Sequence, residues 1–315
     1  MARAHACWCA ERTLQRGSRL VILSWAWSAS RQVDPRLRMR LRFVIAALRN
    51  PAASKQFALA DSTSPLGELL TEWPQTIGSL LWPYQCADWN AATRVNRIAE
   101  HFRVVREIPG LQLKPDEKLI LADLSSFSPG ARLILDRPSW LSREGHLTLS
   151  LFKEDFRAFT LSFSLSGFPH ADLFIGGLQG RHGDEILAMY RDLTKDLNGI
   201  RPRDFMLEAL RMLAVKMGVR HIYAVADEFK ISRHRYFGRK ALPGLFYDEV
   251  WRERNGEQVS AQCFELPLAG SRRPLEEIAA KKRSMYRRRY EMLDNIEGLL
   301  PRDLTTAERR HFNAR

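Results

Sequence analysis

A short apolar strand that runs directly into two glycines is the feature that most restricts how this chain folds. The strand begins at Asp172 and reaches Gly176 and Gly177 after three apolar residues. A strand cannot continue regularly through such a pair, because glycine has no side chain to pack and adopts many backbone angles. The pair predicts a bulge, or the close approach of another backbone or a ligand. We expect any chemistry to lie at this strand end.

Four separate blocks of the sequence carry a resemblance to a known family. They are residues 172–210, which contain the double glycine, His146–Phe152, Tyr247–Trp251 and Lys281–Tyr290. Together these blocks resemble the VirK/YbjX family over roughly residues 35–300. The resemblance implies a bacterial domain of unknown biochemical function, linked to virulence, resistance to antimicrobial peptides and stress responses in Gram-negative bacteria. It transfers no catalytic residues, because the family has none established.

Positive charge is concentrated near the two ends of the chain. The formal net charge is +13; residues 1–50 hold ten arginines and two acids, and residues 271–290 hold eight basic residues and two acids. The long middle part is therefore close to neutral. Basic flanks can face nucleic acid, anionic lipid head groups or solvent, and charge alone leaves all three open.

The four cysteines, at positions 7, 9, 86 and 263, provide neither zinc-ligand spacing nor a disulfide framework. A chain of this size with so few cysteines is typical of a reducing compartment. No histidine is accompanied by a partner at metal-ligand spacing. The sequence therefore predicts reduced thiols, a cytoplasmic location and no metal site.

Four regions are expected along the chain. Residues 1–34 contain the apolar run Leu20–Trp27 behind two arginines, a weak secretory-signal pattern, and we expect a disordered extension or a mis-called start codon there instead. Residues 35–110 are expected to be a helical region and residues 111–300 an α/β core. Residues 301–315 read as a frayed tail.

A basic amphipathic helix is expected at residues 36–49. Its apolar positions share one helical face, and they are Leu37, Leu41, Val44, Ile45 and Leu48. This face is expected either to dock on the domain core, leaving the arginines in solvent, or to contact a membrane surface or a partner.

Downstream of residue 118 the pattern changes to short strands and then helices. Strands are expected at 119–124, 131–135, 146–152, 157–165, 172–178, 221–227 and 259–266, helices at 184–197, 203–217 and 275–300, and a short helical turn at 232–237. Close spacing of the first five strands predicts antiparallel hairpins. The order favours an α/β (α+β) fold with a GNAT-like mixed sheet core, an N-terminal helical region and a basic C-terminal helix. The GNAT likeness is an analogy of topology.

That analogy predicts a site for coenzyme A or an acyl-CoA beside the double glycine. In such a fold a bulged strand opens a V against the next strand, and the following helix N-terminus faces the cofactor's pyrophosphate. The candidate cofactor-binding residues are Gly176, Gly177, Gln179, Gly180, Arg181 and Gly183. The spacing matches the acetyltransferase pattern only loosely, so a glycine-rich turn that merely changes direction is the alternative.

Three residues are candidate catalytic groups for acyl transfer. Tyr236 follows Ser232 by four residues, which places both on one side of a helical turn, and it could protonate a leaving thiolate. Asp227 and Glu185 are candidate bases. Each has a structural alternative, which is ring packing for the tyrosine and helix capping for the two acids.

The run Lys281–Tyr290 is the strongest basic patch. Its candidate contacts for phosphate or an anionic surface are Lys281, Lys282, Arg283, Arg287, Arg288 and Arg289. These cations either bind lipid or nucleic-acid phosphates or remain solvated beside nearby glutamates. The sequence thus supports two functions, an acyl-CoA-binding acyltransferase and a non-enzymatic protein of a membrane surface or nucleic acid. The second would be cytoplasmic and peripheral to the inner membrane.

Overall fold

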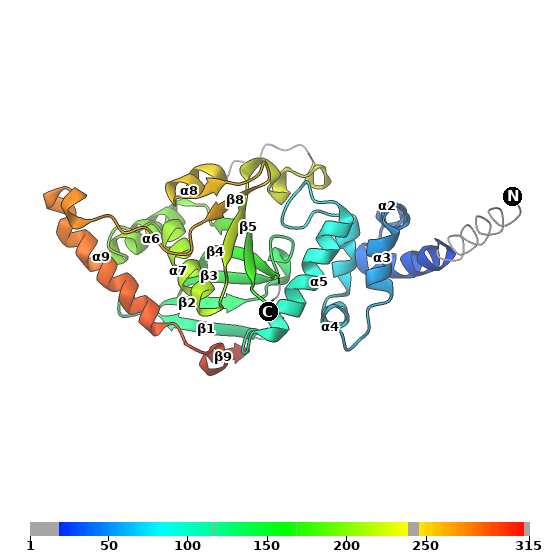
Figure 1. The fold of residues 1–315 in the computed structure, drawn as a ribbon, viewed down its shortest axis with the longest axis horizontal. Helices are drawn as coiled ribbons and strands as arrows, with labels where there is room; N and C mark the ends of the chain where they lie inside the picture. The colour runs from blue at the N-terminus through cyan, green and yellow to red at the C-terminus, as the bar shows by residue number, and fades with distance from the viewer. Residues whose placement is uncertain (1–18, 116, 168, 239–245, 312–315) are drawn as a thin grey trace, which may run out of the picture. The chain divides into compact units, whose positions relative to one another are not determined.

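The computed structural model describes residues 19–115, 117–167, 169–238 and 246–311, and these form two compact units (Figure 1). The first unit comprises the described residues up to Pro83 together with Trp89–Arg103. The second comprises Tyr84–Asp88 and the described residues from Val104 onward. A short piece of the second unit therefore lies inside the sequence of the first.

The first unit is helical. Its elements are a helix at residues 19–33, α2 (Leu37–Arg49), α3 (Pro51–Ala58), α4 (Pro65–Glu72), the 3₁₀ helix η1 (Pro74–Leu80) and most of α5 (Ala91–Glu107). The sequence predicts a disordered extension at residues 19–33, yet they form a helix that buries Ile22 and Ala26. Pro51 both ends α2 and opens α3, because a proline lacks only an N–H that the first helical turn leaves unused.

The second unit is built on one mixed sheet in the order β7-β8-β6-β5-β4-β3-β2-β1-β9. The strands are β1 (Glu117–Asp123), β2 (Ala131–Asp136), β3 (Leu147–Lys153), β4 (Phe156–Ser166), β5 (Asp172–Gly180), β6 (His221–Val225), β7 (Glu257–Gln258), β8 (Cys263–Leu266) and β9 (Glu308–His311). Strands β1 to β5 form the expected antiparallel meander, and β5 pairs in parallel with β6. The α/β class with a mixed sheet is confirmed.

Helices of the second unit lie mainly after the meander. They are α6 (Asp184–Asp196), α7 (Pro202–Lys216), α8 (Tyr247–Glu253) and α9 (Ala280–Leu299), with the 3₁₀ helices η2 (Ser139–Leu141), η3 (Asp227–Phe229), η4 (Ile231–Arg233), η5 (Arg235–Phe237), η6 (Leu275–Glu277) and η7 (Leu304–Thr306). Helices α6 and α7 form the crossover that a parallel β5–β6 pair requires.

Helix α7 packs across β3, β4 and β5, and Figure 1 shows it over the middle of the sheet. Phe205, Leu210 and Leu213 are buried on it. Strands β3 and β4 are buried along nearly their whole length, as expected for central strands covered on both faces.

Two expectations about the C-terminal part are wrong. The sequence predicts a frayed tail that includes residues 308–311, but β9 pairs with β1 at the sheet edge, and Arg309 Nη1 bonds Glu117 Oε1 at 2.7 Å. The strand expected at 259–266 is shortened to β8. Helix α8 has no counterpart among the expected elements.

Candidate functional site

The predicted bulge in β5 is confirmed at Gly176. Ser162 on β4 faces Gly177, whereas the next β4 residue, Phe163, faces Ile175, so Gly176 is the extra residue. A Cβ on Gly176 would lie 2.1 Å from the carbonyl oxygen of Glu144, and one on Gly177 would lie 1.9 Å from Glu144 Oε2. The two glycines therefore make room for Glu144.

Glu144 is the acidic group of this site, and sequence reasoning missed it. Its Oε1 accepts a hydrogen bond from Gln179 Nε2 at 2.6 Å, while its buried Oε2 has no hydrogen-bond partner among the described residues. Loss of hydration raises the pKa of Glu144 to about 7, against smaller lowering effects of Gln179 and Lys230. The carboxyl group can therefore hold or release a proton near neutral pH.

Tyr247 closes the gap between β5 and β6. The ladder between these strands ends at Ile175 and Ala224, and beyond it the Tyr247 hydroxyl accepts from Leu178 N at 2.7 Å and donates to Leu178 O at 3.0 Å. Burial, with a further contribution from Glu144, raises the pKa of Tyr247, so the phenol stays protonated.

The rest of α8 satisfies backbone groups at the end of β6. Trp251 Nε1 donates to Val225 O at 2.9 Å, and Asp248 Oδ1 accepts from Asp227 N at 2.7 Å. The Tyr247–Trp251 block that contributed to the family resemblance thus has a structural task. The V of the GNAT analogy is filled by the Tyr247 side chain.

The segment predicted to hold a pyrophosphate is engaged in packing. A Cβ on Gly180 would lie 2.8 Å from the Phe159 ring and 2.9 Å from the Tyr190 hydroxyl. The backbone N–H of Arg181 already donates to Tyr190 Oη at 2.7 Å. Gly183 precedes α6, whose first turn carries the exposed acids Asp184 and Glu185. Carboxylates at a helix start complement its dipole and repel a phosphate. Cofactor binding here remains a prediction.

The candidate catalytic residues are not gathered into one constellation. Asp227 accepts from Lys230 Nζ at 2.9 Å, from Tyr247 N at 3.2 Å and from Arg233. Burial would raise the pKa of Asp227, but these hydrogen bonds and the Lys230 charge outweigh it and lower the value. Such a carboxylate is a weak base. Glu185 is exposed at the start of α6.

Tyr236 does not share a helical turn with Ser232 as expected. His234 is extended and separates η4 from η5, and its Nδ1 accepts from Tyr236 N at 3.0 Å. The Tyr236 ring is half-buried, lies 5.3 Å from the Arg143 guanidinium and contacts Phe237 edge-on. Its role as a general acid remains a prediction.

The basic residues of α9 divide into two groups. Lys282 and Arg289 line a cavity that also involves α7, whereas Lys281, Arg283, Arg287 and Arg288 do not. Arg289 Nε donates to Asn198 O at 3.0 Å, which fastens α9 to the loop before α7.

A second surface stands out on the first unit, where large apolar side chains are exposed on two consecutive helices. They are Leu20, Val21, Leu23 and Trp27 on the helix at 19–33, and Leu37, Leu41, Ile45 and Leu48 on α2. On α2 the spacing of these residues is four, four and three, which forms one stripe along the helix. The α2 residues that pack inward are instead Phe43, Val44 and Ala47.

Exposed arginines accompany the stripe on α2. Arg38, Arg42 and Arg49 directly follow three of its leucines, and all three are exposed. Because consecutive residues are about 100° apart on a helix, the arginines form a second stripe beside the first. We call these two stripes, with the exposed apolar residues of the helix at 19–33, the apolar-basic face. Of the two expectations for this helix, the exposed leucines favour a surface or partner contact.

No helix in the described part of the chain combines the length and the apolar character needed to span a bilayer.

The chain matches the family described as a protein of unknown function, DUF535, over residues 33–300. It is 29% identical over 310 residues to the uncharacterized protein YbjX of Escherichia coli K12, an alignment that covers 91% of this chain and 92% of that protein. Two uncharacterized proteins of Haemophilus influenzae are 32% and 26% identical over 214 and 217 residues, which covers 66% and 69% of this chain and 70% and 72% of theirs. No solved structure matches the chain.

Proposed function

Since the chain belongs to the DUF535 family of YbjX-like proteins of unknown function, we propose from its own geometry that it acts at an anionic membrane surface, which it binds through the apolar-basic face. The observation that carries this proposal is the exposed stripe Leu37, Leu41, Ile45 and Leu48, with arginines beside it. A helix with this arrangement lies in the plane of a membrane interface.

The energies favour reversible binding. A leucine moved fully from water into an apolar phase gains about 1.5–3 kcal/mol, so the half-exposed side chains of the stripe contribute about 3–5 kcal/mol in total. Each arginine near an anionic surface adds about 1 kcal/mol. The apolar stripe also favours lipid over nucleic acid, because protein–DNA interfaces are more polar and bury few leucines.

We further propose that this surface is the cytoplasmic face of the inner membrane. The resemblance to the VirK/YbjX family implies a role in virulence and in envelope, antimicrobial-peptide or stress defence, and a protein held at that membrane would be well placed for it. The basic flanks support the same location through their charge.

Sedimentation with vesicles tests the membrane proposal. The full chain should bind vesicles of phosphatidylcholine mixed with phosphatidylglycerol, bind pure phosphatidylcholine weakly, and lose affinity as salt rises. The double substitution Leu41→Gln and Ile45→Gln should weaken binding at least about tenfold, because two apolar contacts are lost. Leu299→Gln, an equally exposed leucine on α9 in the other unit, serves as the matched control.

The competing occupant of the apolar-basic face is a second copy of the chain. Size-exclusion chromatography with light scattering separates the two cases. A stable dimer that the Leu41→Gln and Ile45→Gln variant converts to a monomer, with no vesicle binding by either protein, would overturn the membrane proposal.

Acyl transfer is a second candidate, favoured by Glu144 with its pKa of about 7 beside the β5 bulge. A group of that pKa is suited to take a proton from an acceptor amine. Coenzyme A and acetyl-CoA at millimolar concentration should then raise the melting temperature of the protein. Tyr247→Phe, which frees the backbone N–H and C=O of Leu178, should strengthen this effect. No shift with either protein would reject acyl-CoA binding at this strand end.

A further inference from the structure

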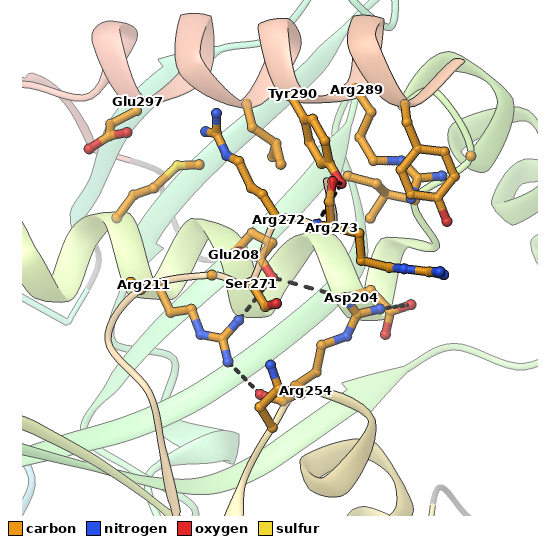
Figure 2. Close-up of a pocket in the computed structure, with 18 of the residues that line it drawn as sticks. Asp204, Glu208, Arg211, Arg254, Ser271, Arg272, Arg273, Arg289, Tyr290 and Glu297 are labelled. Carbon is orange, nitrogen blue, oxygen red and sulfur yellow. Dashed lines mark hydrogen bonds and ion pairs between the residues drawn. The ribbon is translucent and has the colours of Figure 1, made fainter. Parts of the chain in front are cut away.

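A cavity of about 870 Å³ lies in the second unit, between α7, α9 and the loop at residues 268–273. Its size is that of a site for a small organic molecule. Figure 2 shows Arg211 and Arg254 with Glu208 and Asp204 on one side, and Arg289 and Tyr290 extending from α9 on the other. Two sequence blocks that carry the family resemblance, 172–210 and Lys281–Tyr290, thus meet at one cavity.

The two acids of α7 that face this cavity are already neutralised. Asp204 contacts Arg203 at 3.0 Å and Arg254 at 2.5 Å. Glu208 contacts Arg211 at 2.9 Å and Arg254 at 4.0 Å. Because each carboxylate faces two guanidinium groups, neither is left to repel an incoming anion.

Several cations around the cavity have no acidic partner among the described residues. They are Arg201, Arg273, Lys282 and Arg289. Arg211 is 4% exposed, and its Nε has no hydrogen-bond partner in the described part of the chain. In total, seven basic and four acidic residues line the cavity. The excess positive charge, with donors not yet used, is that of a site for a multiply charged anion.

The remaining lining is apolar and aromatic. Met212 and Val215 come from α7, and Tyr286 and Leu293 come from α9. Arg289 lies 4.2 Å from the centre of the Tyr286 ring, which holds this arginine on the cavity side of α9. The ligand therefore needs an uncharged body as well as its anionic groups.

We propose that this cavity binds a small phosphorylated molecule, with its phosphate groups held between Arg201, Arg273 and Lys282. Phosphate is favoured over a single carboxylate because one phosphoryl group presents several acceptor oxygens to converging donors. The same chemistry is found in free phosphorylated metabolites and in the glycerol phosphate of a lipid head group. This site is separate from the apolar-basic face, so it stands whether or not the membrane proposal holds.

Isothermal titration of the full chain with inorganic pyrophosphate, glycerol 3-phosphate and citrate tests the proposal. At least one of the two phosphates should bind at submillimolar concentration. Tighter binding of pyrophosphate indicates a phosphorylated metabolite, and tighter binding of glycerol 3-phosphate indicates a head group. Replacing Arg201, Arg273 and Lys282 by glutamine should weaken binding at least about 100-fold, because each lost charge-assisted contact costs close to a factor of ten.

Two further proteins separate a site from general charge. Lys281→Gln, Arg287→Gln and Arg288→Gln together remove the same charge from α9 outside the cavity, and should change the dissociation constant by less than about threefold. Val215→Trp narrows the cavity without changing its charge and should also abolish binding. This variant decides the matter if the cavity triple variant is unfolded in circular dichroism.

Three results would overturn the proposal. They are no heat of binding for either phosphate at millimolar concentration, an equal loss of affinity in both triple variants, and binding of citrate as tight as that of pyrophosphate.

Discussion

Gly176 and Gly177 are glycines because a carboxyl group occupies the space that their side chains would fill. The sequence predicted the bulge, since a double glycine in a strand is a local signal. It gave no signal for Glu144, which lies in the turn before β3 and reaches β5 only through the folded sheet. A contact of this kind depends on strand register and is invisible to periodicity.

The raised pKa of Glu144 predicts a specific pH dependence of stability. The pKa is about 7 in the folded protein and 4.5 for a glutamate side chain free in water, so the folded protein binds more protons than the unfolded chain between these values. Stability contributed by this group is therefore full below pH 4.5 and falls as pH rises to 7. The loss is about 2 kcal/mol once the partial exposure of the side chain is allowed for.

Urea unfolding at pH 5.5 and pH 7.5 measures this effect. Glu144→Gln keeps the acceptor for Gln179 but cannot ionise, so its free energy of unfolding should decline less between the two pH values than that of the wild type. Other titrating groups are common to both proteins and cancel in the comparison. Parallel pH curves for the two proteins would show that Glu144 titrates normally.

At the scale of elements, hydrophobic periodicity located most helices and strands because each period reports local geometry. It failed where neighbours decide. Helix α8 has seven residues, too few to show a period, and its place is fixed by Tyr247 and Trp251 bonding to β5 and β6. Strand β9 exists because β1 offers a free edge and Glu117 pairs with Arg309.

The α2 helix shows a subtler limit. Its apolar face was identified correctly as a set, but Val44 packs inward while the other four members are exposed. A pattern reports which residues share a side, and cannot report how far a helix is rotated on its support. The candidate membrane face could therefore be found only once the rotation of the helix was known.

At the scale of the whole molecule, the chain passes between the units more than once, and the segment Tyr84–Asp88 belongs to the second unit. Tyr84 Oη and Ser164 Oγ are 2.6 Å apart, Gln85 N donates to Arg143 O at 2.7 Å, and Gln85 Nε2 donates to Phe174 O at 3.0 Å. Cys86 is fully buried. The segment thus supports the same strands that carry Glu144 and the bulge.

Replacing Tyr84–Asp88 in the full chain by a glycine-serine segment of equal length should selectively destabilise the second unit. Loss of one buried tyrosine alone costs about 3–5 kcal/mol, and the lost side-chain hydrogen bonds add about 1 kcal/mol each. That total is comparable with the stability of a typical domain. Hydrogen exchange read by mass spectrometry should show lost protection in β4 and β5, while α2, α3 and α4 keep theirs as an internal reference. Equal loss in both sets of peptides would mean that the two units unfold as one, and unchanged protection in β4 and β5 would mean that the segment is only a linker.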